Sequence, residues 1–385
     1  KVRKNFLPGI SPIVYSRFLL ENTVFLSLND MGKELPDYEE IPHLCKMTDE
    51  VRSEYERLER EFKSISRKSP KIGTRIMSAY MNLLSAYPDQ PYDHDPVYNP
   101  LVENKEEALI IPQSIGDSSV TQPKDEAVLE LVERKIAAGE RVIIYTAWTR
   151  LDTQTKLHRL LTGKNIRTAI LDQRVPTTKR EAWVDKRIAE DTKVLIVNPA
   201  LVETGLDLNA FTTLIFYSLA YNLYIFRQAS RRSWRINQTA PKVEVYMLYY
   251  DHTMQQRALR LMASKLSAAT VIEGNISEEG LAAMSDCEDL TTQLAKELVS
   301  GLKENIDDLS AAFKKMAILG NREAETEKTQ KVVPIITTLP AQKPAESKPN
   351  PAIVSLAEQF HTQITKTVGK TTDTGQLSIF DLLAS

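Results

Sequence analysis

Short apolar runs rich in β-branched residues alternate with longer amphipathic stretches through the middle of the chain. The runs with strand character are 109–111, 141–146, 167–171, 193–197, 214–217 and 243–248. The helical stretches are 124–137, 150–161, 177–189, 221–236 and 253–269. This alternation predicts an α/β fold with a parallel sheet covered by helices on both faces. Ligands of such sheets bind at the carboxyl ends of the strands.

The flanking regions have other patterns. Helical periodicity predicts two helices before the sheet, at 48–62 and 74–87, followed by a connector stiffened by four prolines. After the sheet, apolar residues repeat every three or four positions from Leu294 to Met316, which predicts one long packing helix. From about Gly320 the chain is rich in Lys, Thr, Pro, Gln and Glu, so we expect a disordered tail.

Composition narrows the function. The 385 residues are enough for two or three structural units, and the net charge of −2 excludes nucleic-acid binding by bulk basicity. Such binding would need a local patch. Cys45 and Cys287 lie far apart, which favours a reduced, cytoplasmic setting without disulfides or structural zinc. The Asp93-His94-Asp95 cluster lies between prolines and predicts a loop rather than a metal site.

The segment from 228 to 238 carries the strongest chemical signal. Placed on a helix, Gln228, Arg232 and Arg235 share one face. Two guanidiniums and an amide within reach of one polyanion suit a triphosphate whose charge must be neutralised as a bond breaks. The alternative is a solvated basic face, and the order of the surrounding segments decides against it.

That order resembles the C-terminal half of Swi/Snf-type DNA translocases of helicase superfamily two, over residues 15 to 285. The matching segments are 17–36 (exit from a first motor domain), 48–62 (helical protrusion), 141–148 (motif IV), 198–208 (motif V), 221–238 (motif VI and its approach) and 253–274 (a brace helix). Motif VI carries most weight, because its Gln, two Arg and final Gln recur at the family spacing. The resemblance implies a RecA-like sheet.

The resemblance also implies a division of the chain. Its parts are an exit segment (1–45), a protrusion with a Pro-rich connector (46–105), the second RecA-like domain (106–250), brace and amphipathic helices (251–320) and a tail with a docking peptide (321–385). The chain begins with Lys rather than Met, which suggests a fragment, and it has neither a phosphate loop nor an acidic magnesium box, so we expect the first motor domain to lie outside it.

By resemblance, ATP would bind between two RecA-like domains. Arg232 and Arg235 would approach the γ-phosphate as arginine fingers, and Gln228 would position the nucleotide or water. Gly205 would permit close backbone approach, and Asp207 would bond the nucleotide sugar or link to the arginines. The accompanying Mg²⁺ would be held by the first motor domain.

Duplex DNA is the second implied partner. Lys124, Thr146 and Asn198 would contact its phosphates without reading sequence. Trp148 would either stack on the backbone or belong to the core. Four departures from the family pattern weaken the DNA assignments more than the arginine assignment. They are Ala147 for the usual glutamine of motif IV, Gln173 for the usual glycine after Leu171-Asp172, Val202-Glu203-Thr204 for the glycine-rich start of motif V, and Asn237 for the usual glycine of motif VI.

The chain has no acceptable phosphate loop. Its nearest match to GxxxxGK[ST], at Gly369-Lys370-Thr371, has Ile364 in place of the first glycine and lies in the polar tail. We therefore expect that this chain alone does not hydrolyse ATP, whereas a longer parent protein does.

The tail ends in an apolar peptide. Gln376, Leu377, Ile379 and Phe380 resemble the pentapeptide by which bacterial replication and repair proteins bind the sliding clamp. The alternative is a terminal helix packed on its own domain.

Two other functions remain open from the sequence. The first is a non-catalytic DNA-binding or clamp-tethered adaptor that keeps a degenerate motor fold, which upstream residues without a phosphate loop would favour. The second is another kind of nucleotide-binding α/β enzyme, which is disfavoured because the chain has no glycine-rich loop to hold a cofactor.

Overall fold

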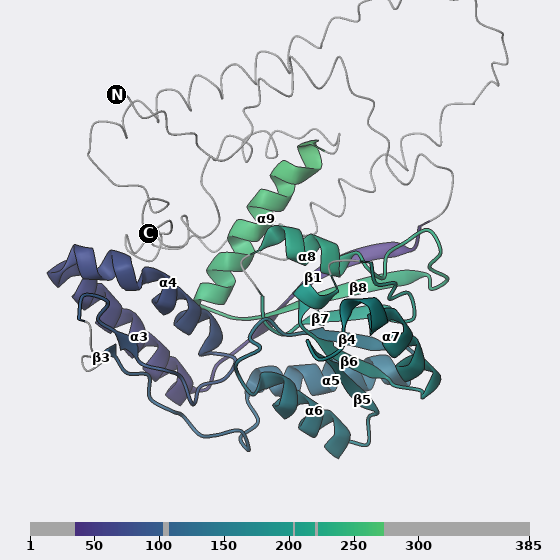
Figure 1. Cartoon of the computed structure of the whole chain (residues 1–385), viewed down its shortest axis with the longest axis horizontal. Helices are drawn as coiled ribbons and strands as arrows, with labels where there is room; N and C mark the ends of the chain where they lie inside the picture. Colours follow the sequence, from purple (N-terminus) through teal and green to yellow (C-terminus); the bar gives the residue numbers. More distant parts are fainter. Residues whose placement is uncertain (1–34, 103–107, 203–204, 220–221, 273–385) are drawn as a thin grey trace, which may run out of the picture. The chain divides into compact units, whose positions relative to one another are not determined.

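The computed structural model describes residues 35–102, 108–202, 205–219 and 222–272 (Figure 1). The predictions for the earlier part of the exit segment, the long helix at 294–316, the tail and the docking peptide with Gln376, Leu377, Ile379 and Phe380 lie outside these residues.

A six-stranded parallel sheet forms the centre of the described part. In spatial order its strands are β1 (Asp37–Cys45), β8 (Lys242–Tyr250), β7 (Thr213–Phe216), β4 (Val142–Tyr145), β6 (Val194–Val197) and β5 (Thr168–Leu171). Every residue of β4, β6 and β7 is buried, as expected for strands covered on both faces. The predicted fold class is confirmed.

Four helices cover the sheet. They are α5 (Pro123–Ala137), α6 (Thr153–Gly163), α7 (Arg180–Ala189) and α8 (Leu223–Ser230). Because βαβ crossovers are right-handed and the strand order reverses at β5, α6 and α7 lie on opposite faces, with α5 beside α6 (Figure 1). Short 3₁₀ turns, η3 (Thr177–Lys179) and η4 (Pro199–Leu201), follow β5 and β6.

Two strand assignments are corrected. β3 (Ala108–Ile110) pairs antiparallel with β2 (Val97–Tyr98) in a separate small sheet, so 109–111 does not belong to the central alternation. β1, which the sequence placed in the exit segment, pairs with β8 at the edge of the main sheet. Its polar sequence and Pro42 hid it, because proline and charge are tolerated on edge strands.

The protrusion is a helical hairpin made of α3 (Asp49–Lys68) and α4 (Pro70–Ala86). Both predicted helices are present and are longer than the patterns indicated. Thr48 caps α3 by accepting a hydrogen bond from the Val51 amide at 3.4 Å. Phe62 stacks on Tyr80 between the two helices, with ring centroids 4.0 Å apart.

The predicted brace helix is also present, as α9 (Met254–Ile272). The Met254 amide donates to the Tyr55 hydroxyl at 2.8 Å, which ties the start of α9 to α3. No helix within the described ranges is long and apolar enough to cross a membrane.

Candidate functional site

The loops that follow the three central strands meet at the carboxyl edge of the sheet. After β4, the Ala147 amide donates to Ser218 Oγ beyond β7, at 2.7 Å. After β6, Asn198 Nδ2 donates to the Ala147 carbonyl at 3.1 Å, and Asn198 Oδ1 accepts from the Ala200 amide at 2.9 Å. The predicted ligand edge is therefore a connected backbone surface, and the Asn198 side chain is engaged in building it.

The helix that was expected to carry all three motif VI residues is shorter than predicted. α8 ends at Ser230, so Arg232 and Arg235 lie beyond it. The prediction that the three residues share one helical face is therefore wrong. The Tyr145 hydroxyl donates to the Ala229 carbonyl at 3.1 Å, which fixes the last turn over β4. Arg232 Nη2 nevertheless donates to Gln228 Oε1 at 3.5 Å, so these two predicted partners do meet.

The segment Arg231–Gln238, which we call the arginine loop, is held against motif V. Buried Ser233 donates through Oγ to the Leu208 carbonyl at 3.1 Å. Gln238 Nε2 donates to the carbonyls of Asn209 at 3.0 Å and Ser233 at 2.9 Å. These two side chains tie the segment after α8 to backbone 25 and 29 residues away in the sequence, which fixes it in a loop rather than in a continued helix.

A third attachment joins the arginine loop to the start of β1. The Trp234 indole Nε1 donates to the Pro36 carbonyl at 2.7 Å. Its ring packs against Tyr38, with centroids 5.3 Å apart, and lies 5.5 Å from the Arg231 guanidinium. Arg232 and Arg235 thus flank two anchored residues, Ser233 and Trp234.

The two arginines form a local positive field. Partial burial lowers the pKa of Arg232, and the nearby Arg235 charge lowers it further, while Asp207 acts in the opposite direction. Within the described residues, the Arg235 side chain has no hydrogen bond or ion pair with a carboxylate. Like charges held together and partly desolvated are relieved by an anion, so the arrangement suits a polyphosphate.

Motif V supplies the neighbouring turn. Gly205 has a φ of 75°, a left-handed conformation that favours glycine, and an added Cβ there would meet no atom within 4 Å. The open space fits the predicted close approach of a ligand to this backbone. Asp207 is exposed and accepts from Asn237 Nδ2 at 3.5 Å, which links motif V to the arginine loop.

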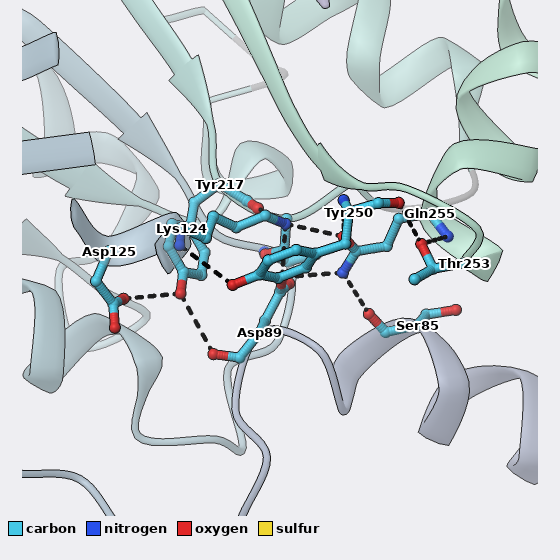
Figure 2. A network of polar contacts seen from close by, with 10 residues as sticks. Ser85, Asp89, Lys124, Asp125, Tyr217, Tyr250, Thr253 and Gln255 are labelled. Carbon is cyan, nitrogen blue, oxygen red and sulfur yellow. Dashed lines mark hydrogen bonds and ion pairs between the residues drawn. The ribbon is translucent and has the colours of Figure 1, made fainter. Parts of the chain in front are cut away.

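The prediction that Lys124 contacts DNA is wrong. Lys124 is fully buried and forms an ion pair with buried Asp89 at 2.7 Å. Its ammonium also donates to the Tyr217 carbonyl at 3.0 Å and to Gln255 Oε1 at 2.9 Å. Figure 2 shows these groups converging from the sheet domain (α5 and the end of β7), from the end of the protrusion and from the start of α9. Lys124 joins three parts of the fold.

Thr146 is also unavailable to DNA. Its side chain is fully buried, and its hydroxyl accepts from Gln154 Nε2 at 2.8 Å. Trp148 is half-buried, with its indole N–H shielded from solvent. Its contact with DNA stays a prediction.

The sequence did not single out the residues that hold the site together. Tyr145, Ser233 and Trp234 hold this segment in place, yet none of them carries a charge that would have marked it as part of a phosphate site. Ser230 and Ser233 could have been noticed, because serines near a helix end often bond backbone groups and terminate the helix.

Residues 123–237 match the family model described as helicase conserved C-terminal domain. The chain is 25% identical over 232 residues to Helicase SWR1 of Mycosarcoma maydis, covering 58% of this chain and 12% of that protein. It is 26% identical over 153 residues to an uncharacterized ATP-dependent helicase of Mycoplasma pneumoniae, covering 39% and 15%. The chain thus spans a small fraction of the length of these curated relatives.

Among solved structures, the C-terminal part of the Fun30 ATPase domain has a TM-score of 0.51 and 15% identity, covering 70% of this chain and 98% of that one. This likeness supports a RecA-like lobe. Together the comparisons support a helicase C-terminal domain at 123–237 in a chain similar to ATP-dependent helicases.

Proposed function

We propose that this chain supplies the second motor lobe of an ATP-driven duplex-DNA translocase, with Arg232 and Arg235 acting as arginine fingers. The observation that carries the proposal is the arginine loop, which Ser233, Trp234 and Gln238 fix to the backbone that precedes β7 and β1. Its match to a helicase C-terminal domain supports the same function.

In this proposal the lobe provides positive charge rather than a nucleophile. As the γ-phosphoryl group is transferred, negative charge spreads over its oxygens, and a preorganised guanidinium stabilises that charge. Arg232, held by Gln228, would act together with Arg235. The acidic ligands for Mg²⁺ and the phosphate loop would come from a first motor domain, and ATP would lie between the two.

The proposed DNA surface changes with the structure. Since Lys124 and Thr146 are buried, their roles pass to exposed backbone around Asn198 and to Trp148. These contacts would position the duplex without reading bases.

The test is ATP turnover by a full-length protein containing both lobes. Arg232→Ala and Arg235→Ala are each expected to lower DNA-stimulated kcat by about 10³-fold or more. Arg231→Ala is the matched control, because it removes an exposed guanidinium from the same loop. If both finger variants keep the turnover of the control, the assignment is wrong.

The sliding clamp is proposed as a second partner through Gln376, Leu377, Ile379 and Phe380, on the sequence resemblance alone. A fluorescent peptide of residues 374–385 is expected to bind purified bacterial clamp, and Leu377→Ala with Phe380→Ala to abolish binding. Equal binding by the double variant would remove this partner. The competing function is an adaptor without ATPase activity. It would be supported if Arg232→Ala and Arg235→Ala left ATP turnover by the full-length protein unchanged.

A further inference from the structure

The tip of the α3–α4 hairpin is strongly basic. Between Glu61 and Asp89 the chain has no acidic residue, although its overall charge is −2. Arg67 and Lys68 lie in the last turn of α3, and Lys71 and Arg75 follow in α4. All four are exposed, and within the described residues none forms an ion pair. The tip therefore has a concentrated and uncompensated positive charge.

Helix stability does not account for this charge. Arg67 and Lys68 are favourable at the C-terminal end of α3, because they complement the helix dipole. Lys71 lies in the first turn of α4, where the dipole disfavours a cation, and that turn has no acidic residue. A cation in an unfavourable position calls for an external partner.

The hairpin is built to hold its tip at a fixed distance. α4 has 17 residues and so spans about 25 Å. Its far end is anchored, since Gln255 Nε2 donates to the Ser85 carbonyl at 2.9 Å and Asp89 pairs with buried Lys124. Along the hairpin, the Tyr80 hydroxyl donates to the Leu58 carbonyl at 3.2 Å. Figure 1 shows α3 and α4 extending away from the sheet, and Figure 2 shows the anchor.

The two helices also approach closely at the tip. A Cβ on Gly73 would lie 2.5 Å from Ser66 Oγ and 2.9 Å from Ser66 Cα, so only glycine fits there. Close packing of the helix ends brings the cations of α3 and α4 to one surface, which suits a line of phosphates better than one small anion.

We infer that the hairpin tip, through Arg67, Lys68, Lys71 and Arg75, is a docking surface for the phosphate backbone of duplex DNA, separate from the arginine loop. This inference rests on the proposed function for its choice of polyanion. The tip would be a second, sequence-independent contact with the duplex. Because the hairpin is anchored, this contact would stay at a fixed position relative to the sheet.

The experiment measures binding of the 385-residue chain to a 30-base-pair duplex by fluorescence anisotropy across a salt series. Lys68→Ala/Lys71→Ala is expected to weaken binding at least tenfold at low salt and to reduce the slope of log K against log salt by roughly two, since each lost phosphate contact contributes about 0.9. Removing Lys71 also relieves an unfavourable interaction with the helix dipole. We therefore expect the variant to fold, so that weaker binding reports the lost phosphate contacts.

The matched control is Arg60→Ala/Lys63→Ala, which removes two cations from α3 that lie near Glu56 and Glu59. The control should keep the wild-type slope. An unchanged slope in the tip variant, equal losses in both variants, or no duplex binding by the wild-type chain would overturn the inference. Polyglutamate that displaces the labelled duplex as well as unlabelled duplex does would assign the tip to an acidic protein. That result would also overturn the inference.

These outcomes are separate from those for the arginine fingers. The tip variant is predicted to lose duplex affinity in this chain alone, where no ATP turnover is expected. The finger variants are predicted to lose turnover in the full-length protein.

Discussion

Trp234 is the residue that attaches the arginine loop to another part of the sheet. Its indole donor is the group that reaches Pro36, and phenylalanine would keep most of the ring while removing that hydrogen bond. A net hydrogen bond contributes about 0.5–1.5 kcal/mol, so Trp234→Phe is expected to lower kcat for ATP in the full-length protein by roughly two- to twelvefold.

Trp183→Phe is the matched control, because Trp183 on α7 lies against Arg187 and does not touch the arginine loop. The Trp234 variant should change kcat more than KM, since it displaces groups that act on the transferring phosphate. Equal kinetics in both variants would show that the Pro36 contact does not position the fingers.

Lys124 also permits a residue-scale prediction. Lys124→Met would leave the Asp89 carboxylate buried without its ion pair, which costs about 3–5 kcal/mol of unfolding free energy. Lys164→Met is the control, because Lys164 pairs with Glu133 at 3.2 Å on the surface and should cost less than about 1 kcal/mol. Urea denaturation measures both, and equal small losses would contradict the buried ion pair.

At the scale of elements, the sequence predicted what hydrophobic periodicity encodes. The central strands and the helices at 124–137 and 253–269 were found within a few residues, because buried strands and amphipathic helices have distinct patterns. β1 was missed because an edge strand needs no apolar alternation. α8 was predicted too long, because Ser233 and Gln238 bond to distant backbone, which periodicity does not record.

The candidate site was predicted in part for a related reason. Gln228 and Arg232 do meet, as their spacing indicated. Lys124 was placed on the DNA track by the family resemblance, which carries no information on whether this side chain is buried. Its burial depends on Asp89 and Gln255, which lie 35 and 131 residues away in the sequence. Such long-range pairing has no local signal.

The connector after α4 provides a pH-dependent element. Burial lowers the pKa of His94 below its usual value of 6.5, while its ring packs against Tyr87 and its Nε2 lies 2.6 Å from the Gln90 carbonyl. Below pH 6.5 the unfolded chain takes up a proton that the folded chain resists. The stability from neutral His94 is therefore complete above pH 6.5 and is lost as the pH falls.

The expected result is a smaller drop in thermal midpoint between pH 7.5 and 5.5 for His94→Gln than for the wild type. His158→Gln, which removes an imidazole from α6, should keep the wild-type drop. Part of the pH dependence should remain in the His94 variant, because burial and Arg134 also lower the pKa of His43. An unchanged drop would show that His94 is already solvated.

For the whole molecule, the proposed chemistry is divided between this chain and another motor domain. In this proposal the described lobe contributes two guanidiniums and an open glycine turn, whose role is to stabilise charge. We expect the 385-residue chain to show no ATP turnover above background, with or without duplex DNA, while the full-length protein turns over ATP. Phosphate release measures both.

DNA-stimulated turnover by the chain alone that disappears in Arg232→Ala/Arg235→Ala would place a complete catalytic site within these residues. That result would contradict the proposed division of the chemistry between two motor domains. It would still support the arginine fingers, because the loss in the double variant would trace the activity to the arginine loop.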